Sequence, residues 1–177
     1  MKKLIHRGYS LVLILLLLSA VAAAALTGCG DAMGDEETPE ITIAYLEGAY
    51  AQQLMNDGAE KLLGSIELNK NESDEIEMIL HPKEIVEDSS APDGYRIDSF
   101  ALNRTFTIPE QAYTTYLSPD GDGEPQILTP ADFYTAVTSD YEKSGADFSE
   151  YGNHILYDVY ALENQTLLIL AHHTSYE

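Results

Sequence analysis

Short alternations of hydrophobic and polar residues predict most of a β-sheet between residues 41 and 172. Residues 65–68 and 75–80 flank a wholly polar stretch, which indicates a hairpin with a solvated tip. A second hairpin is expected around residues 163–165, and because both faces of its strands are largely apolar we place it centrally in the sheet. The predicted strands are 41–45, 65–68, 75–80, 105–108, 112–117, 155–162 and 166–172, and residues 84–87 are expected to extend the sheet.

One helix is predicted over residues 130–144 from its start and stop signals. Thr129 is a suitable N-cap, Pro130 fits the first helical position, and Gly145 follows the end. Asp132 stands where a capping box has an acidic residue. The side chains expected to form its buried stripe are Phe133, Tyr134, Val137 and Tyr141.

The sequence leaves open whether residues 50–63 form a second helix. Its apolar positions fit one helical face, but Asn56-Asp57-Gly58 interrupts them with a turn signal. The pattern as a whole predicts an α+β domain. We expect a curled antiparallel sheet of five to seven short strands, packed by the helix at 130–144 and, in one alternative, by a second at 50–63.

The first 28 residues begin with positive charge and continue into a hydrophobic run. Lys2, Lys3 and Arg7 precede residues 11–26, which Ser19 interrupts mildly. Sixteen residues at about 1.5 Å each reach about 24 Å, which is short of the roughly 30 Å hydrocarbon core, so a permanent span is the weaker interpretation. This arrangement is typical of a signal peptide.

The hydrophobic run ends in Leu26-Thr27-Gly28-Cys29, and here the sequence resembles the bacterial lipoproteins. The resemblance implies that the thiol of Cys29 is joined to diacylglycerol and that signal peptidase II cuts just before this residue. Two or more acyl chains would anchor the protein stably to the membrane, whereas one chain binds only marginally. An ordinary cleaved signal peptide that ends in Cys, or an uncleaved anchor, is the alternative.

The segment after Cys29 is polar and acidic and has no apolar periodicity, so we interpret it as a flexible linker. Eleven flexible residues would span about 18 Å root-mean-square. The predicted organisation is a lipoprotein signal peptide over residues 1–28, an acidic linker over 29–40 and a single α+β domain over 41–177.

Charge and cysteine content exclude several classes of function. The chain of 177 residues has nine Lys and Arg against thirty Asp and Glu, and the part after the leader has six bases and thirty acids, a net charge of −24. Such a surface cannot neutralise phosphates, so nucleic acid is not expected as a partner. The single Cys excludes an internal disulfide and multi-thiolate metal sites.

One loop offers weak candidates for calcium ligands. Asp120, Asp122 and Glu124 alternate with glycine, as at the start of a calcium loop. An EF-hand requires Gly at its sixth position and Glu at its twelfth, where this chain has Pro125 and Ala131. A solvated turn is the favoured interpretation, and no other cofactor is indicated.

Catalytic signatures are weak. Adjacent side chains on a strand point to opposite faces, so at most one of His172 and His173 can join a given site. His81 and His154 lie elsewhere in the sequence. Neither a Gly-x-Ser-x-Gly nor a Ser-x-x-Lys motif occurs, and the resemblance assigns the cysteine to lipid.

Two functional hypotheses follow. The first is a lipid-anchored, extracytoplasmic binding module of the bacterial envelope, without catalytic activity, whose partner is a protein, an envelope polymer or a cation. The alternative is a small envelope enzyme of hydrolase type that uses carboxylates and one histidine. Tyrosine pairs such as Tyr113 with Tyr116 could offer a binding platform, but residues three apart on a strand face opposite sides, so ordinary packing is the favoured interpretation.

Overall fold

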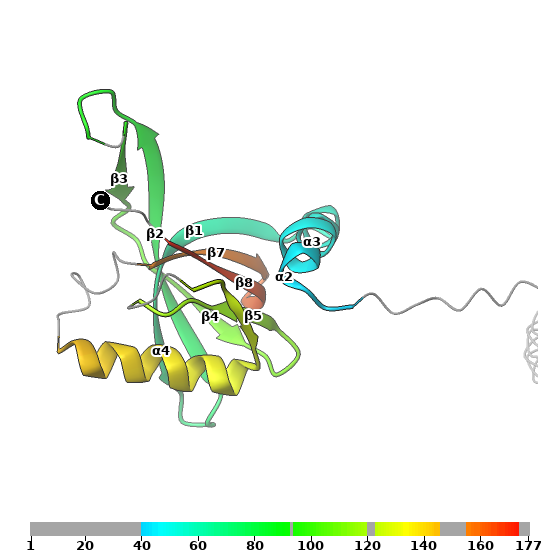
Figure 1. Cartoon of the computed structure of the whole chain (residues 1–177). Helices are drawn as coiled ribbons and strands as arrows, with labels where there is room; N and C mark the ends of the chain where they lie inside the picture. Colours follow the sequence, from blue (N-terminus) through cyan, green and yellow to red (C-terminus); the bar gives the residue numbers. More distant parts are fainter. Residues whose placement is uncertain (1–39, 93, 120–122, 146–154, 174–177) are drawn as a thin grey trace, which may run out of the picture. The chain divides into compact units, whose positions relative to one another are not determined.

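The computed structural model describes residues 40–92, 94–119, 123–145 and 155–173 of the chain (Figure 1). Near its start, α2 (Ile43–Tyr45), the π-helical turn η1 (Leu46–Tyr50) and α3 (Ala51–Asn56) follow one another without a break. A longer helix, α4 (Pro130–Ser144), comes later. The strands are β1 (Glu60–Lys70), β2 (Ile76–Glu87), β3 (Tyr95–Ser99), β4 (Arg104–Ile108), β5 (Tyr113–Tyr116), β6 (Gln126–Leu128), β7 (Ile155–Leu162) and β8 (Gln165–His173).

Five of the strands close into a ring. β1 pairs antiparallel with both β2 and β7, β2 pairs antiparallel with β4, and β7 pairs antiparallel with β8. Parallel pairing of β8 with β4, at Thr107 and Gln165, completes the ring, and β8 also pairs parallel with β5, which lies outside the ring. The predicted α+β class is thus confirmed. The curled sheet is a barrel whose sheet has eight strands among the described residues, and β8 pairs parallel with β4 and with β5.

The ring runs in the order β1-β2-β4-β8-β7, and α4 lies along the chain between β6 and β7. Strands that follow one another along the chain are therefore not always neighbours in the ring, because β7 pairs with β1 and β8 pairs with β4. Barrels of one connectivity carry unrelated functions, so the ligand has to be argued from the site itself.

A side-chain hydrogen bond strengthens the parallel seam. The buried hydroxyl of Thr115 accepts a hydrogen bond from the backbone N–H of Ala171 at 2.8 Å and donates one to the carbonyl of Ile169 at 3.3 Å. These side-chain hydrogen bonds join β5 to β8 in addition to the backbone pairing of the two strands. They also satisfy the buried hydroxyl of Thr115.

The second half of β2 leaves the ring. Residues 83–87 of β2 pair with β3, and we call this two-stranded ribbon the arm (Figure 1). Gly64 of β1 pairs with Pro82 where the arm begins. The backbones come so close there that a β-carbon at position 64 would lie 2.4 Å from the carbonyl oxygen of His81, so the crossing requires glycine.

Two apolar clusters lie on opposite sides of the β7–β8 hairpin. The barrel interior is filled by alternate residues of the strands together with Phe133 and Val137 of α4. The outward-facing Tyr160, Leu168 and Leu170 are covered by the helices at the start of the domain. The predicted central position of this hairpin is thus confirmed, because both faces of its strands are buried.

Two predictions at the start of the domain are wrong. Residues 41–45 are not a strand: the hydroxyl of Thr42 accepts a hydrogen bond from the N–H of Tyr45 at 3.1 Å and caps a helix there. The possible helix over residues 50–63 lies instead over residues 43–56. The Asn56-Asp57-Gly58 turn marks its end, and Gly58 has a φ of 96° just before β1 begins. β3 and β6 were not predicted.

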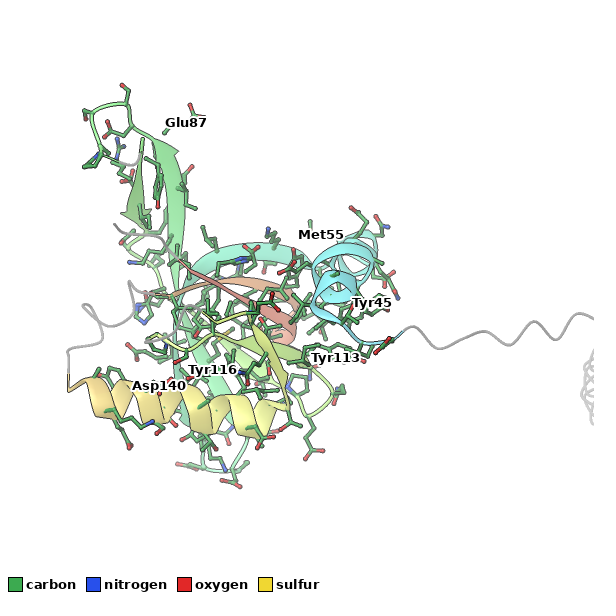
Figure 2. All side chains as sticks on the ribbon, viewed as in Figure 1. Tyr45, Met55, Glu87, Tyr113, Tyr116 and Asp140 are labelled. Atoms are coloured by element: carbon green, nitrogen blue, oxygen red, sulfur yellow. The ribbon has the colours of Figure 1, made fainter. Side chains whose placement is uncertain are left out.

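The prediction for α4 is confirmed in its bounds and caps. The hydroxyl of Thr129 accepts a hydrogen bond from the N–H of Asp132, and Gly145 ends the helix at a φ of 60°. Phe133 and Val137 are buried and Tyr134 is partly buried, as predicted for the stripe. The prediction that Tyr141 belongs to the buried stripe is wrong, because its side chain is 39% exposed. Asp140 accepts a hydrogen bond from the hydroxyl of Tyr116, which joins α4 to β5 (Figure 2). Among the described residues, no helix is long and apolar enough to cross a bilayer.

Candidate functional site

A groove of about 530 Å³ lies between the arm and the outward faces of β1, β7 and β8. Its walls are mainly aliphatic, and a group of charged side chains meets in it. The lining residues are Lys61, Leu63, Ile85, Tyr95, Ile97, Leu156, Asp158 and His172. An apolar hollow with a few convergent polar groups is the usual form of a binding site.

Strand register brings three charged residues of the groove together. Leu63 of β1 lies opposite Asp158 of β7, and Leu156 of β7 lies opposite His172 of β8. Because side chains alternate along a strand, Lys61, Asp158 and His172 share the outward face. Oδ2 of Asp158 lies 2.7 Å from Nζ of Lys61 and 3.0 Å from Nε2 of His172.

Contacts with Asp158 raise the pKa of both His172 and Lys61, and these two groups lower the pKa of Asp158. Burial alone would raise the pKa of Asp158, but hydrogen bonds from His172 and Lys61 hold it below the ordinary value of 3.8. The hydrogen bond to Asp158 raises the pKa of His172 above 6.5, against the opposing effect of burial. Burial would lower the pKa of Lys61, yet the bond to Asp158 raises it overall.

The signs of these shifts define a pH window for the cluster. Asp158 stabilises the folded state above the ordinary carboxyl pKa of 3.8, and this contribution is lost as the pH falls through its lowered pKa. His172 contributes fully below 6.5, and its contribution is lost as the pH rises through its raised pKa. All three charges therefore stabilise the fold together between about pH 4 and about pH 6.5.

Replacing Asp158 with Asn should lower the free energy of unfolding by about 2 kcal/mol at pH 5.5. The loss should be smaller at pH 9, because His172 is then neutral while Lys61 keeps its charge. Urea unfolding at both pH values measures the difference. Glu142→Gln removes the same charge from the exposed side of α4 and should change stability little at either pH. A loss from Asp158→Asn that is greater at pH 9 than at pH 5.5 would contradict the ion cluster.

The residues singled out from the sequence do not meet in this groove, with the exception of His172. Cys29, Asp120, Asp122 and His154 lie outside the described residues. Glu124 is exposed, and the described part of the chain contains no group of three or more His, Cys, Asp or Glu that could hold a metal ion.

His81, Tyr113 and Tyr116 do not line the groove. Nε2 of His81 lies 3.1 Å from Oε1 of Glu67, in a pair formed between β1 and β2. Tyr113 packs against the outward-facing cluster that contains Tyr160 and Leu168, whereas Tyr116 packs against the barrel interior. The two side chains therefore share no face, as expected. Tyr113 instead meets Tyr50 edge to face at 5.1 Å between ring centres, and burial raises the pKa of Tyr50.

Comparison with protein-family models, with curated proteins and with solved structures finds no match to this chain. Its function therefore has to be argued from the groove. The described lining includes no Ser, Thr or Cys, and its hydroxyl is the phenol of Tyr95, so the site offers a charged cluster, aliphatic walls and one tyrosine.

Sequence reasoning missed Lys61 and Asp158. Asp158 did carry a signal, because it is the one acid within the apolar strand 155–162. A buried charge in such a strand needs a partner. Lys61 gave no comparable signal, since it becomes the partner only through the pairing of β1 with β7.

Proposed function

We propose that the chain is a lipid-anchored, extracytoplasmic binding module of the bacterial envelope, and that its groove docks an aliphatic, positively charged segment of a partner protein. The observation that carries the proposal is the apolar inner side of the arm. Ile85 and Ile97 lie opposite each other across the arm, and Ile85 is 54% exposed. A two-stranded ribbon is marginally stable without a surface to pack on, so a segment that fills the groove would bury these side chains and order the arm.

The charge of the domain favours a basic partner. Residues 41–177 contain six Lys and Arg against twenty-five Asp and Glu, a net charge of −19. Ion pairs within the domain already engage the bases Lys61, Lys70, Arg96, Arg104 and Lys143. The excess negative charge therefore remains for a partner, and it would speed the encounter with a basic segment.

Acidic side chains lie on the arm itself. Glu84 and Glu87 are exposed, and Glu87 lies at the end of the arm that is far from the barrel (Figure 2). Glu87 shares the face of Ile85, because side chains alternate along the strand. A lysine or arginine that flanks an aliphatic core in the partner would meet Glu87 while the apolar residues of the partner enter the groove. Attraction of this kind weakens with salt, because the charges are exposed.

Replacing Ile85 with Lys should weaken binding of a basic aliphatic peptide at least tenfold. The change removes an apolar contact and places a like charge against the partner. Fluorescence anisotropy with a labelled twelve-residue Leu/Lys peptide, at 50 and 300 mM salt, measures the affinity. Ile127→Lys on β6, where the wild-type side chain is 37% exposed, makes the same change of charge outside the groove and serves as the control. Docking in the groove would be contradicted if Ile85→Lys and Ile127→Lys weakened binding of the Leu/Lys peptide equally. It would also be contradicted if the wild type bound a Leu/Glu peptide as tightly as the Leu/Lys peptide.

The anchor has its own test in Cys29→Ala. The variant should accumulate as the full-length precursor and should incorporate no lipid label, because the thiol that accepts diacylglycerol is missing. Metabolic labelling with a palmitate analogue and cell fractionation measure both effects. Normal processing and labelling of the variant would refute the anchor and leave the groove proposal standing.

A small envelope hydrolase is a second candidate, favoured by the hydrogen bond between Asp158 and His172. An imidazole held by a carboxylate could act as a general base toward water. Turnover of nitrophenyl esters, phosphates or glycosides by the wild type, reduced at least a hundredfold in His172→Gln, would support this candidate. The binding module predicts no turnover in either protein.

A further inference from the structure

A second hollow, of about 950 Å³, lies at the end of the barrel beside α4. The β1–β2 turn, the corner between β4 and β5, the first turns of α4 and the start of β8 form its walls. In Figure 1 the β1–β2 turn passes beside α4 at this end. We call it the barrel-end hollow, and it shares no lining residue with the groove.

The apolar part of the barrel-end hollow belongs to the barrel core. Ile76 and Ile108 are buried members of the interior cluster, and Pro130 is buried at the first position of α4. The half-buried ring of Tyr134 packs against the same cluster. A ligand in this hollow would therefore meet carbon atoms and one aromatic ring, as well as the polar groups around them.

Uncharged hydrogen-bonding side chains surround this apolar part. The amides of Gln111 and Gln165 are exposed and make no side-chain hydrogen bond among the described residues, so both keep donors and acceptors for a ligand. The hydroxyl of Thr135 donates to the carbonyl of Ala131 at 2.9 Å and can still accept. Ser73 adds a hydroxyl from the β1–β2 turn.

The charges in the hollow disfavour an anion. Lys70 is held 2.8 Å from Asp74 and lies 5.7 Å from the centre of the Tyr134 ring, so its charge is already matched. Glu75 accepts a hydrogen bond from the side chain of Asn71 at 2.9 Å. With Glu110 also in the lining, three carboxylates face one ammonium group. Phosphates and other anions would be repelled, whereas hydroxyl groups can donate to these carboxylates.

We infer that the barrel-end hollow binds a neutral oligosaccharide. A sugar ring combines an apolar C–H face, suited to Tyr134 and the aliphatic floor, with hydroxyl groups that need many donors and acceptors and no net charge. The inference does not depend on the groove or on the anchor, because it rests on different residues.

Isothermal titration calorimetry with four neutral tetrasaccharides tests the inference: cellotetraose, maltotetraose, mannotetraose and tetra-N-acetylchitotetraose. At least one should bind the wild-type domain, and the Gln111→Ala/Gln165→Ala double variant should bind it at least tenfold more weakly. Gln53→Ala/Gln126→Ala removes two other exposed glutamine side chains and should leave the affinity unchanged.

Three outcomes would overturn the inference. The first is no binding of any tetrasaccharide at 10 mM, and the second is equal binding by the wild type and the Gln111→Ala/Gln165→Ala variant. The third is that a charged probe binds at the hollow more tightly than every neutral tetrasaccharide. The charged probes are a tetragalacturonate, a fully deacetylated chitotetraose and a single-stranded oligonucleotide. Circular dichroism checks that the double variant is folded, so that a loss of affinity reports on the hollow.

Discussion

Replacing Gly64 with Ala is expected to destabilise the domain by about 3 kcal/mol or more. A β-carbon at this position would lie 2.4 Å from the carbonyl oxygen of His81 and 2.8 Å from Cδ1 of Leu80. The backbone cannot move aside easily, because Gly64 pairs with Pro82 on one side and with Tyr157 on the other. A shift would disturb two seams of the barrel, and the thermal midpoint should fall by about 10 °C.

Gly48 provides the matched control for this prediction. No atom lies within 4 Å of a β-carbon placed there, and the residue is exposed within the helical turn η1. Gly48→Ala should therefore be neutral or stabilising by about 0.5–1 kcal/mol, since alanine favours helix. Urea unfolding compares the two variants. If Gly64→Ala had the same free energy of unfolding as the wild type, the close crossing of β1 and β2 would be contradicted.

Features that depend on neighbouring residues could be predicted from the sequence. The bounds of α4 follow from a capping threonine, a proline at the first position and a glycine after the end, all of which act within a few residues. The β1–β2 and β7–β8 hairpins follow in the same way from a polar stretch between two apolar ones. In both cases the signal and the structure that it specifies lie in the same segment.

Features that depend on distant residues could not be predicted. Residues 41–45 alternate as a strand does, but Leu46, Ala51 and Leu54 gain more by covering Tyr160 and its neighbours, so the segment becomes a helix. The closure of the ring depends on the pairing of Thr107 with Gln165, far apart in sequence. β3 carries charged residues and gains its place only by pairing with the end of β2.

The candidate site shows the same limit. The sequence indicates His172 as a possible site residue, and in the structure its partner is Asp158 across the hairpin. Lys61 joins them from a third strand. A sequence pattern can indicate which face of a strand a charge occupies. It cannot indicate which charge on another strand lies opposite, because that depends on register between segments about a hundred residues apart.

Replacing Phe133 with Ala should lower the free energy of unfolding by about 4 kcal/mol. Its side chain is 0% exposed and meets the ring of Tyr157 edge to face at 6.0 Å, so the substitution leaves a cavity where α4 packs on the barrel. Phe100, which is 54% exposed, gives the control: Phe100→Ala should change stability by less than about 1 kcal/mol. Urea unfolding monitored by circular dichroism measures both variants.

Phe133→Leu should recover more than half of the loss, because leucine refills much of the cavity. Equal effects of Phe133→Ala and Phe100→Ala would mean that α4 is not packed on the barrel as described. Phe133→Ala should also weaken tetrasaccharide binding in the barrel-end hollow, because Tyr134 and Thr135 follow Phe133 directly on α4 and line that hollow. Since the groove has no residue on α4, the peptide affinity of the fraction that remains folded should stay close to that of the wild type.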